Sequence, residues 1–126
     1  HYNIAAVMTD SPETDKLQFL SESIVTANHC FIRWHGRQVK PRYNYLYSKD
    51  ELKPWVDKVK QISLETTVVR GYFNNHYGAR AVVNAIEFKE MLGAVLSQKE
   101  RAVLENARNL LSHVSRQGTL DNSLRQ

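Results

Sequence analysis

The chain has 126 residues, a net charge of +4, a hydrophobic content of 42% and a charged content of 24%. These values are typical of one globular domain, or of part of one. No apolar run approaches the roughly 18 residues that span a bilayer, and the first residues lack the pattern of a signal peptide, so we expect no membrane partner. The single cysteine, Cys30, excludes a disulfide framework and a multi-cysteine zinc site. A reducing, cytoplasmic setting is therefore expected.

Three segments are rich in apolar, β-branched or aromatic residues and end in polar or turn-forming residues, as strands do. They cover residues 3–10, 29–35 and 66–75. Helical patterns lie between and after these segments, over residues 11–25, 48–62, 78–92 and 97–116. Alternating strands and helices predict an α/β fold of right-handed βαβ units around a parallel sheet. All three strands should then end at one edge of the sheet.

The two clearest helix starts carry a capping box, in which a serine is followed three residues later by a glutamate. Ser48 precedes the helix over 48–62, and Ser97 precedes the last helix. Pro54 conflicts with a start at Ser48, because its missing N–H breaks the helical ladder, so the regular helix could instead begin with Pro54 in its first turn. Gly118 is expected to stop the last helix, with a frayed tail beyond it. We therefore divide the chain into βα units over 1–96 and a C-terminal helix with its tail over 97–126.

The excess positive charge is concentrated in one segment. Of 17 basic and 13 acidic residues, four basic and no acidic ones fall within residues 33–47, so this segment accounts for the whole excess. It begins with the sequence RWHGR over 33–37, directly after a predicted strand. A local basic patch concentrates anionic ligands better than a diffuse charge does.

Polar residues follow each predicted strand, namely Asp10, His35 and the pair Asn74 and Asn75. The carboxyl edge of a parallel sheet is where α/β proteins place their ligand sites. Side chains alternate along a strand, so Cys30, Ile32 and Trp34 should face the helices. Arg33 and His35 should share the opposite face. One asparagine should point inward and the other should brace the following loop.

These positions suggest catalytic roles, each with a structural alternative. Arg33 would hold an anion and His35 would move a proton, unless both belong to a polar layer that satisfies itself. Asp10 would act as a general base, a metal ligand or the partner that fixes His35, unless it only caps a helix. Asn74 and Asn75 would orient a substrate through their amides, or build a turn.

The loop after the second strand supplies further candidate ligand-binding residues. Arg37, Lys40, Arg42 and Tyr47 belong to a segment in which cations alternate with aromatic residues. Such a loop can follow phosphates and stack bases, whereas tyrosines can equally pack the loop onto the sheet. A divalent metal held by Asp10, His35 and Asn75 is a weaker alternative, because the spacings of typical zinc sites are absent.

Four segments together resemble the C-terminal part of the YecE-like family, which is catalogued as domain of unknown function seventy-two. They are TDSP over 9–12, TANHCFIRWHGR over 26–37, YNYLYSKDELKPW over 43–55 and YFNNHYGARAVVNAIEFKEML over 72–92. The match spans about residues 3–92. Arg70, where the family is usually apolar, Trp34, where an aliphatic residue is usual, and the tail from Ser97 onward depart from the family pattern.

The resemblance implies a TIM-type (β/α)8 barrel, of which these strands would be the last three. Such a barrel needs about 200 residues or more, so we expect the chain to be a fragment of a longer protein, or self-association or a partner chain to supply the missing strands. Three hypotheses follow. The first is an enzyme-like pocket that binds a phosphate-containing ligand and hydrolyses it, with no cofactor assigned. The others are a non-catalytic nucleic-acid-binding module and an interaction subunit that completes a barrel with another chain.

Overall fold

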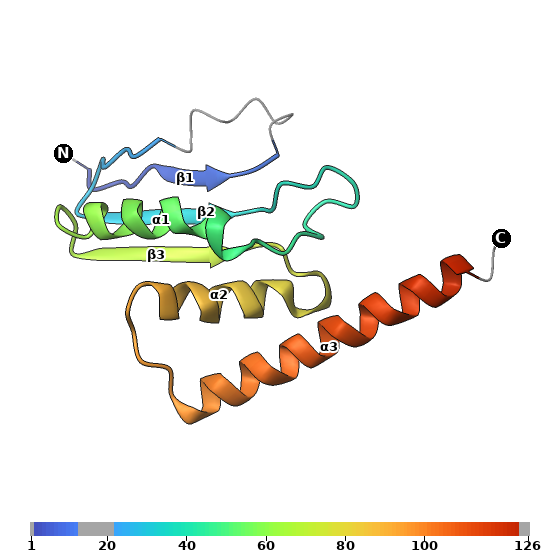
Figure 1. Ribbon diagram of the computed structural model, residues 1–126. Helices are drawn as coiled ribbons and strands as arrows, with labels where there is room; N and C mark the ends of the chain where they lie inside the picture. Colours follow the sequence, from blue (N-terminus) through green and yellow to red (C-terminus); the bar gives the residue numbers. More distant parts are fainter. Residues whose placement is uncertain (1, 13–21, 124–126) are drawn as a thin grey trace.

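The computed structural model describes residues 2–12 and 22–123, and Figure 1 shows how the elements are arranged. Three strands form one sheet: β1 (Val7–Asp10), β2 (His29–Trp34) and β3 (Val68–Phe73). Three α-helices and one 3-10 turn follow or connect them: α1 (Lys49–Ile62), η3 (Tyr77–Ala79), α2 (Arg80–Met91) and α3 (Gln98–Ser123). The predicted α/β order is confirmed for the three strands and the last three helices.

The sheet is parallel throughout, in the order β1-β2-β3. In Figure 1 the three arrows point in the same direction, so the strands end at one edge. The register pairs Thr9 with Arg33 and Arg33 with Tyr72. One row of side chains therefore crosses the whole sheet close to its carboxyl edge.

Among the described residues, helices cover one face of the sheet and not the other. Met8, Cys30, Ile32 and Trp34 are buried on this face and pack with apolar residues of α1 and α2. The strand alternation predicted for β2 is therefore confirmed. Trp34 lies at the centre of this core, with ring contacts to Trp55, Phe73 and Phe88.

The opposite face of the sheet is open among the described residues. Val7, Val68 and Tyr72 are exposed there, and so are the two arginines Arg33 and Arg70. An uncovered sheet face that carries large apolar side chains favours contact with another structural layer. The candidate site lies on this open face.

The helix ends differ from the predictions in three places. α1 begins at Lys49 with the complete Ser48 capping box, and Pro54 lies inside the helix, which loses one backbone hydrogen bond there. The predicted stop at Gly118 is wrong, because the backbone of α3 continues to Ser123. A glycine costs a helix only about 1 kcal/mol and does not end it by itself. Of the helix predicted over 11–25, residues 13–21 lie outside the described residues, and residues 11–12 and 22–25 are not helical.

Candidate functional site

The three strand ends meet at the carboxyl edge, as predicted. The backbone N–H of His35 donates to the carbonyl oxygen of Asp10 at 2.8 Å, and the N–H of Asn74 donates to the carbonyl oxygen of Trp34 at 2.7 Å. The strand ladder thus continues one residue beyond β2 and β3. Asp10, His35 and Asn74 are thereby held side by side by the backbone.

Arg33 and Asn74 form the polar part of a hollow on the open face. The guanidinium Nε of Arg33 donates to Oδ1 of Asn74 at 3.1 Å. Both residues line a hollow of about 360 Å³, together with Val7, Phe31 and Tyr72. The Asn74 bond fixes one side of the guanidinium, and Arg33 is otherwise exposed, so its remaining N–H groups can reach a ligand.

His35 lies beside the aromatic residues of the loops at the same edge. Its ring is 5.8 Å from that of Tyr43, which in turn is 5.6 Å from the ring of His76. Nδ1 of His76 lies 3.0 Å from the carbonyl oxygen of Asn74. These contacts link the rings of His35, Tyr43 and His76 to the backbone of Asn74.

Asp10 points to the helix-covered side of the sheet. Side chains alternate along β1, and Met8, two residues before Asp10, lies on that side. Its carboxylate is 7% exposed. It accepts hydrogen bonds from Trp55 Nε1 at 2.9 Å, from the Tyr47 hydroxyl at 3.2 Å and from Arg37 Nη2 at 3.0 Å. The link between Asp10 and His35 is the backbone bond described above. The carboxylate therefore has the environment of a structural hub.

Arg37 belongs to the same network and not to the hollow. It bridges Asp10 at 3.0 Å and Glu51 at 3.3 Å. The hydrogen bond to Asp10 is the main cause that raises the pKa of Arg37. Burial acts to raise the pKa of Glu51, but hydrogen bonds from Tyr45 and Ser48, together with Arg37, bring that pKa below its usual value. The basic excess of residues 33–47 is therefore partly neutralised by acidic residues from β1 and α1.

Tyr45 and Tyr47 fasten the loop between β2 and α1 onto the core. The hydroxyl of Tyr47, which is 1% exposed, accepts the backbone N–H of Gly36 at 2.8 Å. Burial and the nearby Asp10 carboxylate raise the pKa of Tyr47. The hydroxyl of Tyr45 donates a hydrogen bond to Glu51. Burial and this hydrogen bond raise the pKa of Tyr45 to about 12. Neither ring is presented as a stacking surface.

Asn75 braces the same loop from the strand side. It is fully buried, and its amide donates to the carbonyl oxygen of Tyr45 at 2.7 Å and to Asn84 at 2.8 Å. Asn84, on α2, both donates to and accepts from the backbone of Tyr47. The expectation that one asparagine points inward and the other braces the loop is met by Asn74 and Asn75 respectively.

Lys40 and Arg42 are exposed in the outer part of the loop. The carbonyl oxygen of Lys40 accepts from the side chain of Gln38 at 2.7 Å. The guanidinium of Arg42 lies 5.5 Å above the ring of Tyr43. Neither cation is among the residues that line the hollow.

Sequence reasoning missed three residues of the open face, namely Phe31, Arg70 and Tyr72. Phe31 and Tyr72 line the hollow, and the guanidinium of Arg70 lies 5.7 Å from the centre of the Phe31 ring. The signal was present in the alternation, since Phe31 shares a strand face with Arg33, and Tyr72 shares one with Asn74. The sequence instead predicted ligand binding by the aromatic residues of the loop, because they alternate with basic residues.

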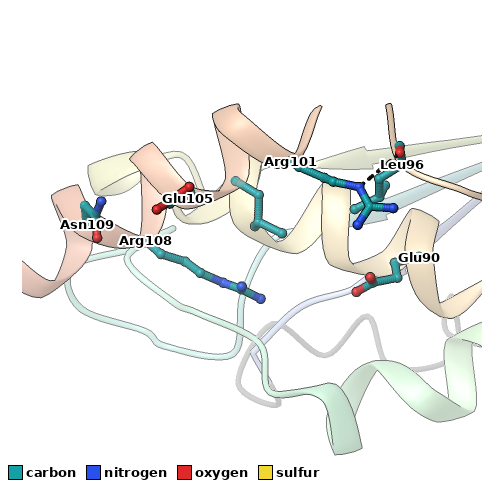
Figure 2. A pocket seen from close by; sticks show the side chains of 7 residues that line it. Glu90, Leu96, Arg101, Glu105, Arg108 and Asn109 are labelled. Atoms are coloured by element: carbon teal, nitrogen blue, oxygen red, sulfur yellow. Dashed lines mark hydrogen bonds between the residues drawn. The ribbon is translucent and has the colours of Figure 1, made fainter. Parts of the chain in front are cut away.

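A second pocket, of about 420 Å³, lies between α2 and α3, and Figure 2 shows its lining. Its cations are already engaged, since Arg101 donates to the Leu96 carbonyl at 3.3 Å and Arg108 pairs with Glu87 at 2.7 Å. Glu90 and Glu105 add the opposite charge, so this pocket has no single sign that would select an ion.

Among the described residues, no three histidine, cysteine, aspartate or glutamate side chains gather as metal ligands. Within the same residues, no helix combines the length and the apolar character that a bilayer crossing requires.

The fold and site define a class: a parallel α/β unit with one open sheet face and a polar pocket at its carboxyl edge. The family model described as "Protein of unknown function DUF72" matches residues 1–108, and the chain belongs to this family. This bears out the family resemblance seen in the sequence.

Solved structures of the family are similar to the chain. A DUF72 family protein from Thermotoga maritima is 32% identical, with a TM-score of 0.61, over 70% of this chain and 36% of that one. One from Enterococcus faecalis is 26% identical, with a TM-score of 0.63, over 71% of this chain and 37% of that one. The chain thus spans little more than a third of the length of these structures. No curated protein matches it.

Proposed function

We propose that the chain contributes three neighbouring βα units to a TIM-type barrel, and that its open face is the barrel interior. The parallel order β1-β2-β3 and the burial of only one sheet face support this proposal. The remaining strands would come from further polypeptide of the same protein, from a second copy or from a partner chain. The cytoplasmic setting favoured by the single cysteine remains part of the proposal.

The proposed function is binding of a phosphate-containing ligand at the carboxyl end of this interior. The observation that carries it is the exposed Arg33 guanidinium, oriented by Asn74 over a hollow of about 360 Å³. Guanidinium groups bind phosphate through two parallel N–H bonds, and such charge-assisted bonds are about twice as strong as neutral ones. Loops at this end of a barrel also form phosphate sites frequently. Asp10, Arg37 and Tyr47 stabilise the fold in this proposal and do not contact the ligand.

Binding is tested by titrating inorganic phosphate into the chain by calorimetry. Arg33→Ala should weaken binding about 10- to 100-fold, because hydrogen bonds to a charged group contribute about 1.5–3 kcal/mol. Arg33→Lys should recover only part of the loss, since an ammonium group lacks the planar fork. Lys99→Ala, at an exposed position on α3, is the control and should bind as the wild type does. Equal binding by the wild type and Arg33→Ala would rule out this site.

Hydrolysis of a bound phosphate monoester is a second candidate function. The observation that favours it is the position of His35, which lies two residues beyond Arg33 and so on the same side of the chain by strand alternation. His35 would accept a proton from a water whose oxygen attacks phosphorus, while the P–O bond to the alcohol breaks and the departing alkoxide takes a proton from bulk water. Turnover of p-nitrophenyl phosphate should then be lost in His35→Ala while phosphate binding persists. Turnover that is equal in His35→Ala and the wild type argues for binding alone.

A further inference from the structure

The hollow contains an aromatic surface beside its cation. Phe31 and Tyr72 lie on neighbouring strands, with ring centres 6.1 Å apart and ring planes only 6° from parallel. Aromatic rings favour such offset, parallel arrangements. Tyr72 is 49% exposed, so about half of this large side chain is accessible to a ligand that could extend the stack.

The aromatic surface and the anion site are adjacent through the strand register. Tyr72 pairs directly with Arg33 across the sheet, and neighbouring strands lie about 4.8 Å apart. Asn74, which orients the guanidinium, is two residues beyond Tyr72 on the same face. A single small molecule can therefore contact the ring and the guanidinium together.

The remaining lining narrows the chemistry of the ligand. Val7 adds an apolar wall, and none of the described residues that line the hollow is acidic. Oδ1 of Asn74 already accepts a hydrogen bond from Arg33. The other described lining residues are apolar or aromatic, apart from the Tyr72 hydroxyl. The hollow thus combines one cationic end with one flat aromatic end and has few groups that could read a hydrogen-bond pattern.

We propose that this hollow binds a 5′-nucleotide unit, with its phosphate on Arg33 and its base stacked on Tyr72. The inference rests on the proposed phosphate site and specifies the ligand class for it. Stacking on an aromatic side chain tolerates any base, so recognition should depend on ring area and not on base identity. Purine nucleotides should bind more tightly than pyrimidine nucleotides for that reason.

The test compares ligands that differ by one part at a time: inorganic phosphate, ribose 5-phosphate, AMP and CMP, titrated into the chain under the same conditions. AMP should bind about 10-fold more tightly than ribose 5-phosphate, with CMP between them. Tyr72→Leu keeps an apolar strand residue but removes the ring, and it should abolish the AMP advantage, measured as the ratio of the AMP affinity to the ribose 5-phosphate affinity of the same variant. Tyr72→Phe should retain the advantage. Tyr77→Ala removes a similarly exposed tyrosine outside the hollow and serves as the control.

A 5′-phosphorylated oligonucleotide distinguishes a free nucleotide from the end of a strand. Tighter binding than AMP, lost with Tyr72→Leu, assigns the site to a strand end, whereas equal or weaker binding assigns it to the free nucleotide. Equal affinity for AMP and ribose 5-phosphate, or an AMP advantage that survives Tyr72→Leu, overturns the inference but leaves the phosphate site standing. Absence of binding by every phosphate ligand, inorganic phosphate included, overturns the proposed function itself.

Discussion

Replacement of Asp10 by alanine should destabilise the fold strongly without acting on the hollow. The carboxylate is 7% exposed and accepts from Trp55 at 2.9 Å and from Tyr47 at 3.2 Å. Both donors are buried, and leaving a buried donor unsatisfied costs about 1–3 kcal/mol. Arg37 is 44% exposed and still has Glu51, so its loss adds only about 0–1 kcal/mol. We therefore expect a total loss of about 3–4 kcal/mol.

The assay is urea unfolding followed by circular dichroism, with Asp10→Asn and Asp57→Ala as companions. Asp10→Asn keeps one acceptor oxygen and should lose about half as much stability as Asp10→Ala. Asp57 is exposed on α1, so its replacement should change the free energy of unfolding by less than about 0.5 kcal/mol. A loss below about 1 kcal/mol for Asp10→Ala would refute the hub interpretation. Weaker phosphate binding by the still-folded Asp10→Asn would instead return Asp10 to the ligand site.

Two further predictions concern packing and pH. Gly71→Ala would place a Cβ 2.7 Å from Cζ3 of the buried Trp34 ring. This substitution should therefore reduce the free energy of unfolding by about 1–3 kcal/mol. An unchanged midpoint of urea unfolding would contradict this packing. The pKa of Tyr45 is raised from 10.0 to about 12 in the fold, so its contribution to stability is full below pH 10 and is lost as the pH rises through about 12. Tyr45→Phe should flatten this alkaline decline, and an identical decline in both proteins would show that Tyr45 does not cause it.

The three strand segments and the two faces of β2 could be predicted from the sequence because both depend on local patterns. Residues such as Cys30 and Ile32 alternate with Arg33 in a short segment, and alternation alone decides which face each takes. The capping boxes are equally local, since Ser48 and Glu51 satisfy each other's backbone within one turn. The end of α3 could not be predicted from Gly118, because one glycine costs a helix only about 1 kcal/mol and does not end it by itself.

The division of the polar residues between two faces of the sheet could not be predicted in this way. Arg33 and Arg37 look equivalent in the sequence RWHGR, yet Arg33 faces the open hollow and Arg37 pairs with Asp10 and Glu51. These partners lie 27 and 14 residues away along the chain. Pairing over such separations depends on the packing of the loop, which no short pattern encodes.

This division changes how the basic segment acts. A patch with four free cations would attract any polyanion through its summed field, but in this fold Arg37 is paired with acidic residues, and Lys40 and Arg42 are not among the residues that line the hollow. The residue that remains at the sheet is Arg33, held by one asparagine and flanked by an aromatic ring on the neighbouring strand. Recognition by one oriented guanidinium and one ring favours a small ligand of defined shape over a long charged surface. The network around Asp10 contributes indirectly, because it holds the loop and the strand ends in the positions that shape the hollow.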